Sequence, residues 1–425
     1  MTRNFAEHPL RAVILAEMHA RPFRPMRAPM RLLHFGFMTN GAQRRADREA
    51  LCALCAAHGA EPRAPGAKHH FVTIDGVRLR WEQHSEFTTY SFASEDLPDR
   101  AFEPAEPPFA SLIAGIGQPG PLLVMADLHL VTREGGAALE SLFDVNSVAA
   151  SEAADRCALV ATDFQARDNG AVRILVIDQG LTPIRAGALV RRLLEIETYR
   201  TLSLLGLPEA HRLAPHVREA EKKLAAIAGE MTGVDDLATD HRLLGELTAL
   251  SAEIEAETNA SSYRFGASRA YDQIVTQRLA AIGEAQYGGY SSLQSFLARR
   301  VGPAMHTCAI LEQRQANLAE KLARAANLLR TRVDVEIERQ NRDLLQSMNE
   351  RTRLQLRLQQ TVEGLSVAAI SYYIVGLIAY VLKGLKDAGV GPDPALGTAL
   401  AVPLCVLFVA WAVRRIRRRH RDGEH

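Results

Sequence analysis

The chain has 425 residues, 47% apolar and 23% charged, and a formal net charge of +1. This composition is typical of a globular protein with two or three domains and excludes a largely disordered chain. A net charge near zero gives no general attraction to nucleic acid. The five cysteines are odd in number and scattered, as expected of reduced thiols rather than a disulfide framework.

The first 30 residues contain no signal-peptide pattern. Arg11 and Glu17 interrupt the apolar run from Leu10 to Ala20, so no cleavable leader is expected.

Residues 1–183 are predicted to form an α/β domain. Short runs rich in β-branched and aromatic residues predict strands at 31–38, 71–74, 77–81, 87–92, 122–131, 158–164 and 173–177. Asp75 and Gly76 form the two-residue turn that favours a hairpin. The stretch 98–119, which contains five prolines, is predicted to be an extended surface loop.

Residues 184–301 are predicted to form a helical domain. Apolar residues recur at steps of three and four over 186–205, 208–228, 237–257 and 267–286. Gly206-Leu207-Pro208 and Gly288-Gly289 are helix-ending sequences. These segments are therefore expected to pack as antiparallel helices.

Residues 302–364 are predicted to form one long stalk helix, since neither proline nor glycine occurs between Pro303 and Gly364. Such a helix would extend on the order of 90 Å. Its apolar residues recur mostly every four positions, which favours a nearly straight bundle over a left-handed coiled coil. A bundle of stalks from several copies would bury this stripe, so a homo-oligomer is expected.

Residues 365–413 are predicted to be a membrane hairpin. The uncharged runs Leu365–Leu382 and Ala395–Val413 each have the ~20 residues that cross a bilayer as a helix. The tail, 414–425, carries six arginines within its first eight residues. By the positive-inside rule, both termini and the large N-terminal portion are expected to be cytoplasmic.

A polar row at seven-residue spacing runs along the stalk and the first span, where its face drifts only ~20° per step. Its members are Thr352, Gln359, Ser366, Tyr373 and Tyr380. Such a row avoids lipid, which leaves two interpretations: hydrogen bonding between helices, which is favoured, or the lining of a pore. Glu363 is either a carboxylate ring at the pore mouth or a solvated interfacial residue.

Small residues on the second span, Ala395, Gly397, Ala399 and Ala401, permit close helix packing, and Pro403 is a candidate kink.

No catalytic or metal-binding motif organises the chain. Cys52, Cys55 and His58 lie on one apolar helix without a second ligand pair, so core cysteines are expected rather than zinc ligands. No hydrolase, phosphate-loop or dinucleotide signature occurs. The chain is therefore predicted not to be an enzyme and to use no metal or other cofactor.

The most enzyme-like local cluster is Glu17, His19 and Arg21, before Pro22 and Pro25. Without an evident nucleophile, the favoured interpretation is a proline turn with a Glu17–Arg21 ion pair. A membrane-tethered enzyme that uses this cluster is the alternative.

Three motifs carry a family resemblance: His19-Ala-Arg-Pro-Phe23, Trp81-Glu-Gln-His-Ser-Glu-Phe-Thr-Thr-Tyr90 and Leu194-Glu-Ile-Glu-Thr-Tyr-Arg200. With the terminal pair of spans, they resemble an uncharacterised bacterial family of membrane-anchored proteins, domain of unknown function 3422. The resemblance runs end to end, implies the inner membrane of a bacterium, and brings no established activity. The motif residues it marks are Glu17, His19, Arg21, Pro22, Trp81, Glu82, Glu86, Glu195, Tyr199 and Arg200.

The order of head, helical middle, stalk and two spans also resembles CorA-type divalent-cation channels. That resemblance implies a ring of subunits, a pore lined by the first span, and a divalent cation as cargo. The family's Gly-Met-Asn signature is absent, and Tyr380-Val-Leu-Lys-Gly384 stands in its place. Lys383 puts a positive charge where a cation channel avoids one.

The sequence therefore predicts an α+β protein of CorA-like architecture that is anchored in the lipid bilayer. An ion transporter of unknown selectivity is the leading function, and a membrane-anchored scaffold or sensor module is the alternative.

Overall fold

A computed structural model describes residues 8–11, 14–15, 23–97, 102, 109–134, 138–233, 236–387, 389 and 393–421, the side chains of 416–421 excepted. These residues belong to two compact units. The first, Met1–Gly233 with Gly245–Ala326, is called the head. The second, Val234–Leu244 with Asn327–His425, is called the stalk–hairpin unit.

The head contains a nine-stranded sheet with the order β2-β3-β4-β1-β5-β8-β7-β6-β9. All described neighbouring strands are antiparallel except β5 and β8. The strands are β1 (Met30–Met38), β2 (His69–Ile74), β3 (Val77–Gln83), β4 (Phe87–Ser94), β5 (Leu122–Thr132), β6 (Ala149–Ala153), β7 (Ala158–Thr162), β8 (Val172–Asp178) and β9 (Ala285–Gln286). The predicted mixed α and β class is confirmed.

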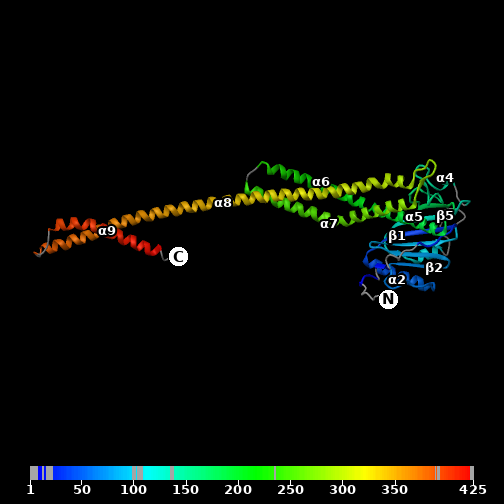
Figure 1. The fold of residues 1–425 in the computed structure, drawn as a ribbon, viewed down its shortest axis with the longest axis horizontal. Coiled ribbons are helices and arrows are strands. Elements are labelled where there is room, and N and C mark those ends of the chain that lie inside the picture. The colour runs from blue at the N-terminus through cyan, green and yellow to red at the C-terminus, as the bar shows by residue number, and fades with distance from the viewer. Residues whose placement is uncertain are drawn as a thin grey trace, which may run out of the picture. The chain divides into compact units, whose positions relative to one another are not determined.

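Eight helices accompany the sheet in the described residues (Figure 1). They are α2 (Gly41–Ala57), α3 (Phe109–Gly115), α4 (Leu139–Leu142), α5 (Pro183–Ser203), α6 (Gly206–Met231), α7 (Leu237–Ile282), α8 (Leu293–Asp387) and α9 (Pro394–Arg421).

The predicted hairpin turn is confirmed, because Ile74 pairs with Val77 and the residues between them have positive φ. Asp75 has a φ of 49° and Gly76 a φ of 82°, which suits a type I′ turn.

Strands β2, β3, β4 and β1 form an antiparallel part of the sheet that is called the wing. One face of the wing packs against α2 and α3. Trp81, Tyr90 and Phe92 are fully buried there. Buried Asp47 on α2 accepts hydrogen bonds from Trp81 Nε1 (2.8 Å) and the Tyr90 hydroxyl (2.6 Å). This satisfies the buried carboxylate and fixes α2 on the wing.

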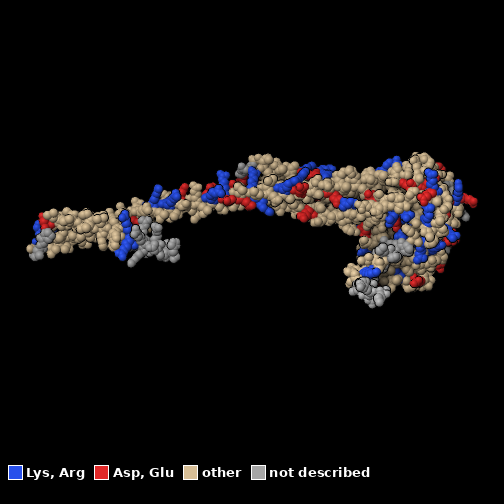
Figure 2. Space-filling view, in the orientation of Figure 1, with Lys and Arg blue, Asp and Glu red and all other residues tan. Residues whose placement is uncertain are grey.

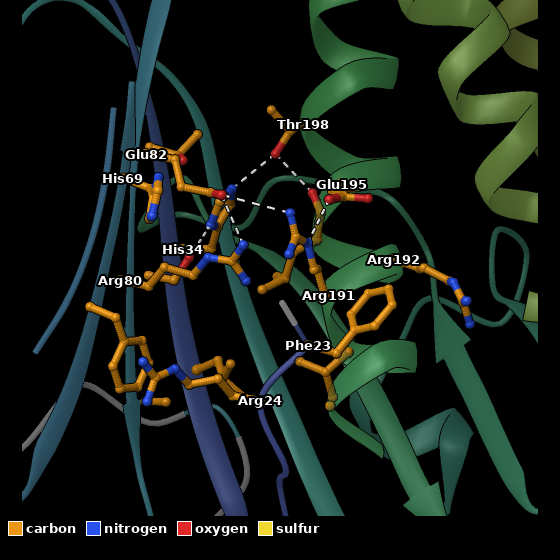
Figure 3. Close-up of a pocket in the computed structure, with 18 of the residues that line it drawn as sticks. Phe23, Arg24, His34, His69, Arg80, Glu82, Arg191, Arg192, Glu195 and Thr198 are labelled. Atoms are coloured by element: carbon orange, nitrogen blue, oxygen red, sulfur yellow. Dashed lines mark hydrogen bonds and ion pairs between the residues drawn. The ribbon is translucent and has the colours of Figure 1, made fainter. Parts of the chain in front are cut away.

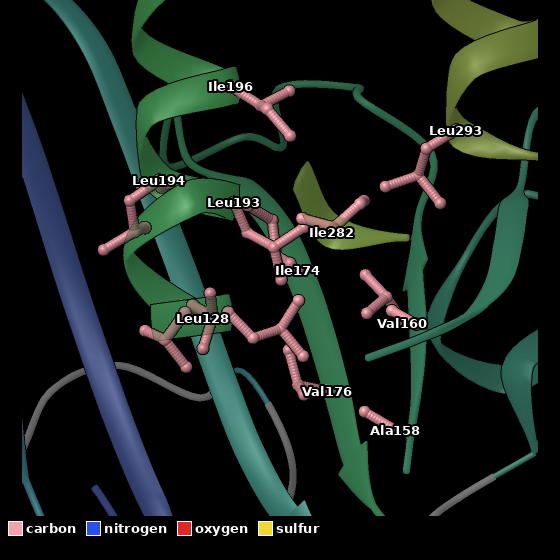
Figure 4. Packing of buried hydrophobic residues seen from close by; sticks show 14 of the residues in the cluster. Leu128, Ala158, Val160, Ile174, Val176, Leu193, Leu194, Ile196, Ile282 and Leu293 are labelled. Atoms are coloured by element: carbon pink, nitrogen blue, oxygen red, sulfur yellow. The ribbon is translucent and has the colours of Figure 1, made fainter. Parts of the chain in front are cut away.

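Helix α5 packs on the opposite face, over the middle of the sheet (Figure 4). Leu193 and Ile196 meet Leu128 of β5 and Ile174 of β8 in one buried cluster. At α5's start, Thr182 caps the helix and Pro183 supplies the fixed φ that suits a first turn.

Within the head, α6, α7 and the first part of α8 run side by side (Figure 1). Three pairs of side chains link them: His216–Glu257 (2.5 Å), Arg269–Glu312 (2.5 Å) and Arg314–Glu221 (2.7 Å). Helices thus make up most of residues 184–301, while a separate helical domain there stays a prediction.

Three features of the sequence-based assignment are wrong. The predicted helices 237–257 and 267–286 are not separate: α7 runs without a break from Leu237 to Ile282, and residues 285–286 form β9. Residues between the two predicted segments are buried, including Ser261 and Phe265. Hydroxyls of Thr258 and Ser261 bond carbonyls four residues back, which satisfies them within the helix.

The stretch 98–119 is not only an extended loop, since it contains α3. Phe109 and Leu112 of α3 are buried, as is Phe102. Strands β6 and β9 were not predicted, because the alanine-rich β6 has low strand propensity and β9 has only two residues.

Helix α8 is longer than the predicted stalk, since it begins at Leu293 in the head and Pro303 lies inside it. From Asn327 onward it belongs to the stalk–hairpin unit. The portions of α8 and α9 that follow the stalk pack on each other: a Cβ atom at Gly397 would lie 2.7 Å from Leu382 Cδ1. Charged atoms are sparse along this pair on the face that Figure 2 shows. Both helices contain an apolar stretch long enough to cross a bilayer, which favours membrane association.

Candidate functional site

A cavity of about 830 Å³ lies in the head between the antiparallel wing and α5. Its strand wall is the wing face that carries His34, Arg80 and Glu82 (Figure 3). The other face of the wing packs against α2. Because side chains alternate along a strand, one face of the wing supplies apolar core and the opposite face supplies the wall of this cavity.

Strand register sets polar side chains in rows across the cavity wall. Arg80 of β3 lies opposite Ser91 of β4, and Ser91 lies opposite His34 of β1. In the next row, Glu82 lies opposite Thr89. All five side chains line the cavity.

The facing wall comes from α5, where Arg191, Glu195 and Thr198 recur at helical spacing and point toward the strands (Figure 3). Helix α7 adds Arg278. With the segment Phe23–Met26, the cavity is built from four separate parts of the chain.

Ion pairs join these walls. Arg80 donates to Glu82 at 2.8 Å, and Arg191 lies 3.7 Å from the same carboxylate. Arg191 also donates to Glu195 at 2.8 Å, and Arg278 donates to Glu195 at 2.5 Å. Burial alone would raise the pKa of Glu82, but the nearby guanidinium groups of Arg80 and Arg191 hold it below its usual value. Glu82 is therefore ionised at neutral pH.

His34 is buried and bonded at both ring nitrogens. Its Nδ1 lies 2.7 Å from Ser91 Oγ, and its Nε2 lies 2.9 Å from Thr198 Oγ1. Since the Thr198 hydroxyl donates to the Leu194 carbonyl, it must accept from the imidazole, which assigns the proton to Nε2. Nδ1 then accepts from Ser91.

Burial lowers the pKa of His34 to about 4, which leaves the ring neutral at physiological pH. A group with this pKa is a weak general base at neutral pH, so the Ser91–His34 pair is poorly suited to activate a nucleophile. The arrangement instead fixes β1, β4 and α5 relative to one another.

The segment Phe23–Met26 borders the cavity next to α5. The Met26 amide donates to the Pro183 carbonyl at 2.9 Å. Gly187 of α5 lies directly against this segment, since a Cβ atom there would lie 1.9 Å from the Arg24 carbonyl oxygen. Only glycine permits this approach.

The cavity lining is strongly cationic. Six arginines line it against two glutamates, an excess of four positive charges with histidines neutral. Among the described residues, Arg24 and Arg192 have no carboxylate partner and instead lie over aromatic rings. Arg24 Cζ lies 3.6 Å from the Phe71 ring centroid, and Arg192 Cζ lies 5.4 Å from that of Phe23. The arrangement can bind an anion.

The motifs 81–90 and 194–200 meet around this cavity. Phe23, the last residue of the motif 19–23, joins them there. Phe23, Glu82, Glu195 and Tyr199 line the cavity, while Trp81 belongs to the core on the far face of the wing. The predicted residues Glu17, His19, Arg21 and Pro22 lie outside the described residues.

The remaining motif residues link elements of the head. Glu86 accepts from Arg264 (2.6 Å) and from the Tyr271 hydroxyl (2.6 Å), both on α7. Arg200 makes two 2.6 Å bonds to Glu197 and lies over Phe164. Their positions indicate structural roles.

Part of the predicted polar row lies beside a smaller groove in the stalk–hairpin unit. Gln359, Glu363 and Ser366 line this groove of about 340 Å³ with Val413 of α9. Thr352 is exposed and donates to the Met348 carbonyl.

The tyrosines of the row lie on the open side of the helix pair, where Tyr373 is 71% and Tyr380 78% exposed. Ser371, which is 3% exposed, faces the pair's interior instead. Whether the row meets another copy or a pore stays a prediction.

Cys55 and His58, which were considered as zinc ligands, have other surroundings. Cys55 is buried in the core, and His58 Nδ1 lies 3.0 Å from Asp75. Within the described ranges, no group of three or more His, Cys, Asp or Glu side chains is placed to hold a metal ion.

Sequence reasoning missed Arg24, His34, Arg80, Arg191, Arg192 and Arg278 as site residues. A signal was present in β3, where Arg78, Arg80 and Glu82 alternate with Val77, Leu79 and Trp81. Such alternation predicts one polar face, but it does not show that a helix covers that face and leaves a cavity.

No curated protein matches the sequence. The profile of the family described as protein of unknown function (DUF3422) matches residues 6–420, and the chain therefore belongs to that family.

Proposed function

We propose that this protein is a membrane-anchored receptor whose head binds a small molecule in the cavity between the wing and α5. The observation that carries this proposal is the cavity itself, which family-motif residues Glu82, Glu195 and Tyr199 line. Its volume of about 830 Å³ is within the ~300–1,000 Å³ of small-molecule sites. This develops the sensor alternative raised by the sequence.

In this proposal, the hairpin of α8 and α9 anchors the protein in the inner membrane of a bacterium. The arginine-rich tail and the head lie in the cytoplasm by the positive-inside rule. The cavity would then sample cytoplasmic metabolites. No catalytic step is proposed, since the buried, neutral His34 is a poor base.

Native mass spectrometry of the full-length protein, released gently from membranes, tests the receptor function. Thr73 is exposed and lines the cavity, so Thr73→Trp should block it. Thr276 is exposed on α7 and is not part of the lining, so Thr276→Trp is the matched control.

Wild type and Thr276→Trp should carry an additional small-molecule mass that Thr73→Trp has lost. If the added mass is absent from the wild type, or equal in all three proteins, the cavity is not the receptor site.

A second function, ion transport by a CorA-like oligomer, is favoured by the polar row on the stalk and first span. The exposed Tyr373 and Tyr380 leave that face free for a second copy or a shared pore. Ion flux into liposomes should then fall in Ser366→Leu and Tyr373→Leu variants that still assemble. Undiminished flux in those variants, or none in the wild type, contradicts transport along this row.

A further inference from the structure

We infer that the ligand is an organic anion with two or three negative charges, such as a phosphate ester or a polycarboxylate. This inference rests on the proposed receptor function and names the class of molecule that the cavity would take.

The cavity interior leaves one cation in excess. Arg80, Arg191 and Arg278 share two carboxylates, those of Glu82 and Glu195. Arg78 also lines the cavity, but its charge is balanced by Glu95 at 2.8 Å. A ligand that carries a positive charge would meet net repulsion here.

Two further cations are added by Arg24 and Arg192. Within the described part of the chain, neither forms an ion pair, and each is positioned over an aromatic ring, Phe71 and Phe23 respectively. A guanidinium that lies on a ring keeps its N–H edge free for an acceptor, so the aromatic contact orients it without using its donors. Both side chains are prepared to bind oxygen atoms.

After Glu82 and Glu195 of the lining and Glu95 beside it are counted, the six arginines of the lining leave about three positive charges in excess. A monoanion would leave most of this charge uncompensated in a half-buried site, whereas a dianion would neutralise most of it and a trianion all of it. Guanidinium groups bind phosphate and carboxylate through paired N–H···O bonds, which favours these two anions.

The rest of the lining limits the ligand to an organic molecule. Between the arginines lie Leu32, Val190, Leu194 and Phe87, all buried apolar residues. Such a surface favours a carbon skeleton between or beside the charged groups.

Isothermal titration calorimetry of the full-length protein in neutral detergent tests the inference. Citrate and phenyl phosphate are the polyanionic probes, and acetate and phenol are the controls with one charge and none. At neutral pH, both polyanions should bind at least tenfold more tightly than acetate. Raising the salt concentration should lower the affinity of the protein for both polyanions.

Arg24→Gln and Arg192→Gln should each weaken citrate binding about tenfold, which corresponds to about 1.4 kcal/mol. Arg212→Gln is the control for net charge, since Arg212 is exposed on α6 and pairs with Glu209 outside the lining. It should bind citrate as the wild type does.

Equal binding of citrate and acetate, or citrate affinity that both lining variants retain, would overturn the inference. If instead a neutral or cationic molecule co-purifies and Thr73→Trp expels it, the receptor function stands and the anion class is wrong. If no molecule binds in the cavity at all, both fail.

Lipid headgroups carry the same phosphate and carboxylate groups as free organic anions. A competition experiment distinguishes the two kinds of ligand. Glycerol 3-phosphate should displace citrate from the protein in phosphatidylcholine nanodiscs. Displacement only by nanodiscs that contain phosphatidic acid would overturn the assignment of a free organic anion.

Discussion

His34 shows how one buried residue connects the cavity to the stability of the head. Its imidazole joins β1 to Ser91 of β4 and to Thr198 of α5. The sequence did not identify His34 as a site residue, because its two partners are 57 and 164 residues away. Strand alternation predicts the face of a residue but not the distant side chains that complete its bonding.

The low pKa of His34 predicts that the head loses stability in mild acid. The unfolded chain takes up a proton near pH 6.5, whereas the folded head resists it until about pH 4, so stability falls as the pH drops between these values. The loss would reach about 3 kcal/mol. Thermal melting across this range should show a steep fall in the wild type.

The His34→Gln variant should melt lower at neutral pH but respond less to acid, since glutamine at position 34 does not titrate. Parallel pH profiles of the two proteins would show that another group controls the acid response.

Gly187 is predicted to be intolerant of even one methyl group. Gly187→Ala places Cβ against the Arg24 carbonyl and should lower the free energy of unfolding by about 1–3 kcal/mol. Gly266→Ala on α7 is the matched control, because no atom lies within 4 Å of its Cβ position. It should stabilise the protein by about 0.5–1 kcal/mol.

Chemical denaturation compares the two glycine variants. A Gly187→Ala protein as stable as Gly266→Ala would mean that the Phe23–Met26 segment does not lie against α5.

At the scale of elements, α7 is the helix that links the motif residues to the helical part of the head. Glu195 of α5 bonds Arg278, and Glu86, between β3 and β4, bonds Arg264 and Tyr271. The periodicity of α7 was detected from the sequence but its continuity was not, because the residues from Thr258 to Gly266 have low helix propensity and tertiary burial compensates for it.

The Glu86 contacts are predicted to hold the β3–β4 turn on α7. Glu86→Gln removes the charge and should increase amide hydrogen exchange around residues 84–87, with the core of the wing unchanged. Glu95→Gln, which affects an exposed pair, is the control. Equal exchange in both variants would show that the Glu86 contacts do not restrain this turn.

At the scale of the whole molecule, the sequence predicted the two apolar helices and the long α8 well, since their patterns are local and strong. The cavity could not be predicted, because it depends on strand order and on how far α5 extends over the wing. The N-terminal cluster of Glu17, His19 and Arg21 lies outside the described residues, so its role stays a hypothesis.

The homo-oligomer predicted from the stalk and hairpin can be tested by cysteine cross-linking in membranes. In a Cys405→Ser background, Tyr373→Cys should form disulfide-linked dimers, because this position is 71% exposed. Ser371→Cys, at a position 3% exposed, should not. Equal cross-linking at both positions would argue against an interface on the tyrosine face.

The contact between Gly187 and the backbone of Arg24 has a consequence for how this protein can diverge. The contact uses the main-chain carbonyl of Arg24, which every residue type has. Pro25 is exposed, and its replacement by another residue leaves this carbonyl in place. Among natural variants, position 25 should accept many residues, while position 187 should remain without a side chain.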